Sequence, residues 1–190
     1  MKLSKRNLPR INAEGFTLIE VLISMFILTI GLLSLLGVFG LAVSATMTSE
    51  EDGIAKQLAQ DAFESIYTAR DSANLQWTDI ENAGANGGIF LTGFQPIYNS
   101  GNDAIYGTAD DSAAGAQTLT LPGPDGIVGT ADDVTVSLTN FQRQITITDV
   151  VSGGSIVPNL KTVTVTVQYT VPRSRWPKSY VLSGFISQYR

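Results

Sequence analysis

The segment from Phe16 to Val43 reads FTLIEVLISMFILTIGLLSLLGVFGLAV and contains a single charged residue, Glu20. It is 28 residues long, and no charge follows between Val21 and Ser49. Because a helix of roughly 20 apolar residues crosses a bilayer, this segment predicts a membrane-spanning helix. A secretory signal peptide is the alternative, but its apolar region should run about 7–15 residues and end in a cleavage site of small residues.

The segment before this span is basic. Residues 1–15 contain one acidic residue, Glu14, and four basic residues, Lys2, Lys5, Arg6 and Arg10. Basic residues stay on the cytoplasmic side of a membrane span. We therefore expect a single-pass inner-membrane protein with its N-terminus in the cytoplasm and the rest of the chain in the periplasm.

The composition narrows the function classes. The 190 residues include 12 Lys+Arg and 17 Asp+Glu, for a net charge of −5, and neither cysteine nor histidine. Without these two residue types the chain has no disulfides, no Ser-His-Asp or Cys-His nucleophile pairs and no ordinary zinc ligands. The sequence thus argues against an enzyme, and its acidity argues against a nucleic-acid partner.

Glu20 needs a partner, because a carboxylate near a bilayer is costly unless it is paired. If the chain is cut after Gly15, Phe16 carries a free α-amine that is positive at neutral pH. Glu20 follows four residues later, about one helical turn away. It could therefore pair with this amine, or with the Phe16 amine of a neighbouring subunit.

Residues Gly15 to Glu20, GFTLIE, resemble the prepilin cleavage motif of type IV pilins and type II secretion pseudopilins. The resemblance implies that a membrane prepilin peptidase cuts after Gly15 and N-methylates Phe16. It implies that Glu20 guides docking into a growing filament, and that other major and minor pilins and an inner-membrane assembly platform are partners. The continuation at 27–33, ILTIGLL, resembles the minor pilins known as type IV pilus modification proteins.

The helix is expected to continue beyond the span as an amphipathic helix up to Arg70. Apolar residues recur as doublets every four residues, at Ile54, Ala55, Leu58, Ala59, Ala62, Phe63, Ile66 and Tyr67, which is typical of a helix that packs on a sheet. A helix from Phe16 to Arg70 would be about 80 Å long.

Alternating Val, Ile and Thr residues in the C-terminal third predict half-buried antiparallel strands. These strands cover 134–139, 145–148, 162–171 and 180–186, with a turn at Gly153-Gly154. From 73 to 101 the chain reads as a surface loop with one short strand near 89–94. The prediction is an α+β, type IV pilin-like fold in which the long N-terminal helix packs on an antiparallel sheet.

Three regions follow from these patterns. Residues 1–15 are a leader peptide, 16–49 form the membrane-spanning and filament-core half of the helix, and 50–190 form a periplasmic head. Loss of the leader removes four basic residues and one acid, leaving 8 Lys+Arg, 16 Asp+Glu and a net charge of −8.

The head contains an internal repeat. GNDAIYGTADD at 101–111 recurs as GPDGIVGTADD at 123–133, with eight of eleven positions identical. Hard oxygen ligands on a tight glycine loop suit Ca²⁺, and an ion bound here could replace the disulfide that many pilins use as a clip. The alternative is a pair of Asx-turn loops with solvated acids. The candidate ligands are Asp103, Asp110, Asp111, Asp125, Asp132 and Asp133.

Two further signals carry less weight. Side chains of neighbouring residues point to opposite faces of an extended chain, so we expect Asp110-Asp111 and Asp132-Asp133 not to converge. The basic-aromatic cluster at 173–178 could hold single-stranded nucleic acid, although a polar turn before the last strand fits the acidic chain better.

These observations favour a minor pilin, a structural subunit that helps to start, cap or decorate a type IV pilus. A minor pseudopilin of a type II secretion system has the same N-terminal motif. A filament-tip adhesive or ligand-binding module, with the repeat loops as its binding surface, is an alternative of a different class.

Overall fold

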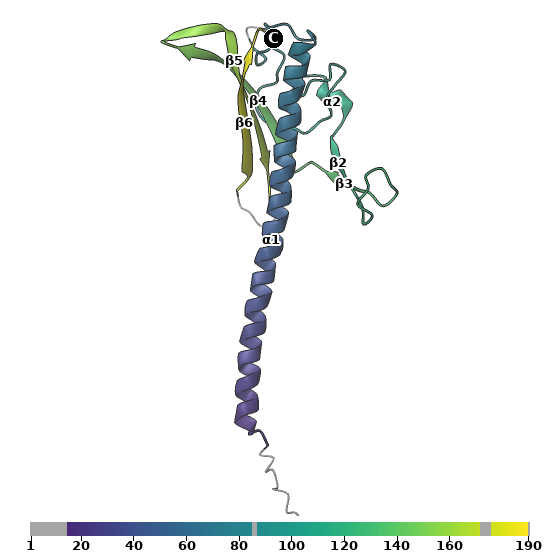
Figure 1. The fold of residues 1–190 in the computed structure, drawn as a ribbon, viewed down its shortest axis with the longest axis vertical. Coiled ribbons are helices and arrows are strands. Elements are labelled where there is room, and N and C mark those ends of the chain that lie inside the picture. The colour runs from purple at the N-terminus through teal and green to yellow at the C-terminus, as the bar shows by residue number, and fades with distance from the viewer. Residues whose placement is uncertain (1–14, 85–86, 172–175, 190) are drawn as a thin grey trace, which may run out of the picture. The chain divides into compact units, whose positions relative to one another are not determined.

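The computed structural model describes residues 15–84, 87–171 and 176–189 (Figure 1). The chain divides into two units, the first ending at Ala45 and the second beginning at Thr46. The elements within the described residues are α1 (Leu18–Asp71), β1 (Gln95–Pro96), α2 (Asp111–Ala114), β2 (Thr118–Leu121), β3 (Val134–Ser137), β4 (Phe141–Ser152), β5 (Ser155–Tyr169) and β6 (Lys178–Ser187).

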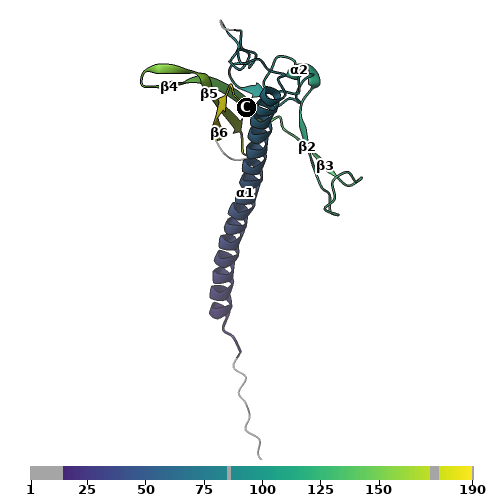
Figure 2. The ribbon, with the colours of Figure 1, turned by 45° about the horizontal axis from the view of Figure 1, so that its top comes forward.

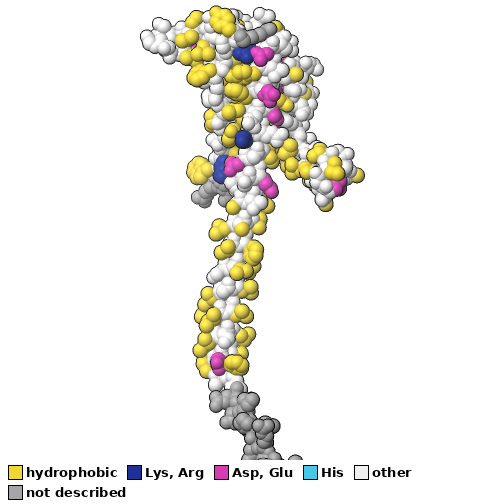
Figure 3. Space-filling model, in the orientation of Figure 1, with side chains coloured by type: hydrophobic (Ala, Val, Ile, Leu, Met, Phe, Trp, Pro, Cys, Tyr) yellow, Lys and Arg dark blue, Asp and Glu magenta, His cyan; other side chains and the backbone are white. Residues whose placement is uncertain are grey.

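The first unit is the apolar part of α1. The helix begins at Leu18, after Thr17, whose side-chain oxygen accepts a hydrogen bond from the Glu20 N–H at 3.3 Å, as in an N-cap. Within α1, an 18-residue window has a mean hydropathy of 2.6 and is 0 % buried. Figure 3 shows hydrophobic side chains along this part of the helix. A core helix of a soluble protein would bury such a surface, so length, composition and exposure together fit a membrane span.

Three hydroxyl side chains in this span are satisfied inside the helix. Ser24, Thr29 and Ser34 each donate their hydroxyl to the carbonyl oxygen four residues earlier, at 2.7–2.9 Å. In an apolar environment an unpaired hydroxyl would be costly. The three hydroxyls are therefore compatible with lipid or with a bundle of apolar helices.

In the second unit, α1 packs on a sheet through one face. Its buried residues are Ala55, Leu58, Ala59, Ala62, Ile66 and Ala69, which confirms the predicted stripe. Ile54, Phe63 and Tyr67 are partly buried beside it. Four of the six buried residues are alanines, so the helix can approach the sheet closely.

The sheet is antiparallel, in the order β1-β4-β5-β6. Val163, Val165 and Val167 of β5 are fully buried in the same core as α1, whereas the intervening threonines are half-buried. Gly153 and Gly154 join β4 to β5 with φ values of 60° and 82°, the left-handed conformation that a two-residue hairpin turn requires. The predicted alternation and the predicted turn are confirmed.

A separate hairpin carries the second repeat loop. β2 pairs with β3 so that Leu121 lies opposite Val134, and residues 122–133 connect the two strands. Figures 1 and 2 show this hairpin on the other side of α1 from β4, β5 and β6. The strand β3 lies within the predicted strand 134–139, whereas β2 was not predicted, although the alternation Thr-Leu-Thr-Leu at 118–121 is typical of a strand.

The prediction of a short strand near 89–94 is wrong. Phe90 forms only an isolated bridge with Asn82, and the strand that pairs with β4 is Gln95–Pro96. Further along β4, beside Ile145 and Ile147, the side chain of Asn82 occupies the position of a neighbouring strand. The Asn82 amide donates to the Ile145 carbonyl at 2.7 Å and accepts from the Ile147 N–H at 2.8 Å, so two ladder positions of β4 are satisfied by one residue.

The loop that contains Asn82 is tied down at a second place. The Lys161 ammonium, on β5, donates to the Ile80 carbonyl at 2.9 Å and to the Glu81 carboxylate at 2.8 Å. Lys161 is buried, and a buried ammonium is tolerable when it is paired in this way. The predicted surface loop is therefore anchored to the sheet at its start.

Candidate functional site

The Gly15-Phe16 bond lies ahead of the helix and is open to solvent. Both residues are outside regular structure, and Phe16 is 83 % exposed. A Cβ atom built on Gly15 would meet no atom within 4 Å. The predicted cleavage site is thus sterically accessible, while residues 1–14 of the predicted leader are outside the described residues.

Glu20 lies in the first turn of α1, where the helix dipole favours an anion. It is the only charged residue from Phe16 to Ser49. If Phe16 carries a free, positive α-amine, Glu20 is therefore the only carboxylate of this segment that can pair with it. The roles of Gly15, Phe16 and Glu20 in cleavage, methylation and docking stay predictions.

The first repeat loop, 101–111, folds around its own carboxylates. Asp111 accepts hydrogen bonds from the N–H groups of Gly101 at 3.1 Å and Gly107 at 2.6 Å. Asp110 accepts from the Asn102 N–H at 2.8 Å and from the Thr108 hydroxyl at 2.7 Å. The loop is closed by these bonds across its whole length.

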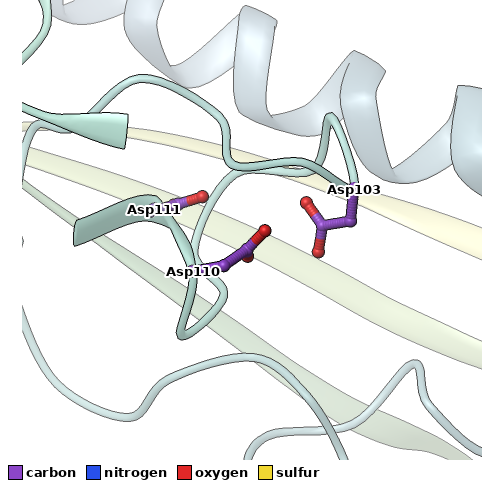
Figure 4. A group of neighbouring side chains, drawn as sticks. All are labelled: Asp103, Asp110 and Asp111. Carbon is purple, nitrogen blue, oxygen red and sulfur yellow. The ribbon is translucent and has the colours of Figure 1, made fainter. Parts of the chain in front are cut away.

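The carboxylates of Asp103, Asp110 and Asp111 converge, each offering one oxygen within 4.8 Å of the others (Figure 4). The expectation that neighbouring aspartates diverge is therefore wrong for Asp110 and Asp111. The chain is not extended there, since Asp110 has helical backbone angles and Asp111 begins α2. In the part of the chain that the structure describes, this is the only group of three acidic residues so arranged.

The second loop, 123–133, repeats the internal bonds of the first. Asp133 accepts from the Gly129 N–H at 2.6 Å, as Asp111 does from Gly107, and Asp132 accepts from the Thr130 hydroxyl at 2.6 Å. Gly107 and Gly129 have φ values of 89° and 97°, which confirms the tight glycine turn predicted for both copies. The threonine common to the two copies, which sequence reasoning missed, was detectable as an identical position.

One difference between the loops follows from proline chemistry. In the first loop the tenth position, Asp110, accepts from the N–H of Asn102. The second loop has Pro124 at the equivalent place, and proline has no N–H. Asp132 accepts instead from the next residue, Asp125, at 3.3 Å.

Threonine hydrogen bonds lower the pKa values of two carboxylates. The bond from Thr108 lowers the pKa of Asp110, and the bond from Thr130 lowers the pKa of Asp132. A lowered folded-state pKa contributes stability above the unfolded pKa, and this is lost as the pH falls through the folded value. For both groups this loss falls in the acidic range, below the ordinary pKa of an aspartate.

The first loop is also tied to a buried cation. Arg143 of β4 is 4 % exposed, donates to the Leu58 carbonyl at 3.5 Å and lies 4.4 Å from the centre of the Tyr106 ring. Burial lowers the pKa of Arg143 to about 10, and attraction to Asp111 is the largest effect that opposes this shift. The pKa of Asp111 is raised by its own burial. Arg143 was not singled out in the sequence, where nothing marks it as buried.

The Ca²⁺ prediction stays a prediction, and a melting experiment separates it from the Asx-turn alternative. We expect the full chain in detergent to melt higher in millimolar Ca²⁺ than in chelator at matched ionic strength. Ligand binding to the folded state alone stabilises it by about 2.7 kcal/mol at a hundredfold excess over Kd. The Asp110→Asn/Asp111→Asn variant should lose the shift, and Mg²⁺ should substitute poorly, because it demands octahedral geometry. A melting temperature indifferent to Ca²⁺ would leave the Asx-turn interpretation.

The basic-aromatic cluster predicted at 173–178 lies partly outside the described residues. Residues 172–175 lie outside the described residues, and Trp176 is 78 % exposed just before β6.

An apolar, unburied helix that begins just after an accessible Gly-Phe junction and continues onto an antiparallel sheet defines a pilin-like α+β protein. The chain matches the family model described as the prokaryotic N-terminal methylation motif over residues 10–36. No curated protein and no solved structure matches the chain. The match confirms the predicted prepilin-type cleavage and methylation motif. The likeness to the type IV pilus modification subgroup stays a prediction.

Proposed function

We propose that the protein is a minor pilin, a non-enzymatic subunit that helps to assemble, initiate or decorate the tip of a type IV pilus. The observation that carries the proposal is the exposed Gly15-Phe16 junction in front of an apolar helix with one carboxylate, Glu20, in its first turn. A prepilin peptidase would cut after Gly15 and methylate Phe16. The partners are other major and minor pilins and the inner-membrane assembly platform.

The exposed apolar surface of the helix supports this proposal, because it limits the environments in which the helix is stable. An unburied apolar surface of this length is stable in lipid or among similar helices. A filament subunit uses both environments, first the bilayer and then the helix bundle. On this proposal the head stays in the periplasm until assembly carries it to the pilus or cell surface.

The first test is the identity of the mature N-terminus. Mass spectrometry of the protein extracted from membranes of cells that carry the peptidase should find a chain that begins at N-methylated Phe16. The matched control is Gly15→Leu, which should retain residues 1–15. Because a Cβ atom on Gly15 meets no atom of the described residues within 4 Å, we expect this substitution to leave the head folded. An intact Met1 terminus on the wild-type chain would contradict the proposal.

The second test separates a pilus from a secretion system. Deletion of the gene should reduce the number of surface pili and leave protein secretion unchanged. The opposite result, normal pili with a loss of secretion, would identify a minor pseudopilin instead.

A further inference from the structure

The two copies of the repeat end in opposite environments although their backbones agree. The isoleucine at the fifth position is 1 % exposed in the first copy, as Ile105, and 60 % exposed in the second, as Ile127. The next residue of the second copy, Val128, is 62 % exposed. Both loops contain the bonds from the glycine N–H and the threonine hydroxyl to the last two aspartates, so the turn around the isoleucine is alike and its exposure differs with what lies against it.

The first copy shows what surrounds this motif when it is docked. Ile105 belongs to the core that α1 and the sheet build. The following residue, Tyr106, donates its N–H to the Ser65 hydroxyl of α1 at 3.3 Å and lies beneath the guanidinium of Arg143. A docked copy thus places its isoleucine in an apolar recess of a helix-on-sheet head, with a cation beside the last carboxylate, Asp111.

The second copy has the same features and no such cover. It lies at the end of the β2–β3 hairpin, whose last cross-strand pair, Leu121 and Val134, is 41 % and 54 % exposed. Cross-strand partners lie on one face of a hairpin, so this pair forms an exposed apolar patch on the stem that carries the loop. The exposed Asp125 and Asp132 add negative charge to the same loop. Figure 3 shows this lobe with hydrophobic and acidic side chains together.

We propose that loop 123–133 is a docking arm that inserts Ile127 and Val128 into the head of a different pilin subunit. The recess it needs is apolar and has a lysine or arginine at its rim, like the place that Ile105 and Asp111 occupy. A second copy of this chain does not offer that place, because its own first loop fills it. The inference rests on the proposed function, since filament assembly brings a second head within reach.

Cross-linking in intact cells tests the contact directly. The chain has no cysteine, so Val128→Cys creates its only thiol, which can be labelled with a photoreactive maleimide. The matched control is Val151→Cys, whose parent residue is 61 % exposed at the β4–β5 hairpin. We expect an adduct at position 128, and little or none at position 151, to another protein whose N-terminus carries the prepilin motif.

A pair of double variants tests whether the contact matters for assembly. Ile127→Asp/Val128→Asp should lower incorporation into sheared filaments about tenfold or more, the effect of losing one to two energetically important contacts at an interface. Val151→Asp/Ile156→Asp is the control, because these two residues are paired across β4 and β5 and are 61 % and 60 % exposed. Exposed substitutions have small effects on stability, so both variants should melt near the wild-type temperature.

The outcomes separate this inference from the proposed function. Equal incorporation of the two double variants, equal adducts at positions 128 and 151, or an adduct between two copies of this chain would overturn the docking arm. An adduct to a protein without the prepilin motif would also overturn it. If the wild-type chain lacks N-methylated Phe16 or never enters filaments, the proposed function itself fails.

Discussion

If the chain is a pilin as proposed, we expect replacement of Glu20 by glutamine to lower incorporation of the processed chain into filaments by about 100-fold or more. In the apolar surroundings of a helix bundle, the α-amine of Phe16 would lose its countercharge, and breaking a buried ion pair costs about 3–5 kcal/mol. Each 1.36 kcal/mol corresponds to about tenfold in an equilibrium. Membrane insertion and cleavage should remain, because removing a charge makes a span easier to insert.

The measurement is the ratio of chain in sheared filaments to chain in membranes, with Phe16 methylation checked in both fractions. Glu20→Asp keeps the charge on a shorter side chain and should recover most of the loss. Ser24→Ala is the structural control, because it removes a hydroxyl that bonds only to the Glu20 carbonyl in this helix. Wild-type incorporation of the glutamine variant would rule out the ion-pair role.

Replacement of Ile105 by alanine destabilises the head by about 2–5 kcal/mol, the range for emptying a well-packed core position. The same substitution at Ile127 changes stability by no more than about 0.5 kcal/mol, because exposed residues away from special features contribute little. The two isoleucines occupy the same position of the same motif, one 1 % and the other 60 % exposed. The comparison therefore measures how much packing against α1 and the sheet contributes to stability, because the local sequence is nearly the same at both positions.

Urea unfolding of the full chain in detergent, followed by tryptophan fluorescence, measures both values. Trp77 is a suitable reporter, since its indole N–H donates to the Pro158 carbonyl at 3.1 Å and its ring lies 5.1 Å from the Lys161 ammonium. The midpoint should fall for Ile105→Ala at an unchanged slope. Similar midpoints for the two variants would show that the first loop is not part of the cooperative core.

Features that depend only on residues close together in the sequence were predictable from the sequence alone. The Gly15-Phe16 junction, the apolar span and the stripe on α1 follow from composition and a helical period. The strands β5 and β6 follow from a period of two, and Gly153-Gly154 marks the turn before them. In each case the pattern of a short segment already specifies its backbone and its buried face.

Features that depend on contacts between distant segments were not predictable in this way. The side chain of Asn82 replaces a strand beside β4, and Arg143 is buried beneath a loop more than thirty residues earlier in the chain, as the numbering of Tyr106 and Arg143 shows. The two copies of the repeat show this dependence on distant segments directly. Eight of eleven residues are identical in the two copies, and both copies contain the same glycine turn and the same threonine–aspartate bond. Ile105 is buried and Ile127 is exposed because only the first loop is placed against α1 and the sheet, and the burial of a side chain depends on its neighbours in space.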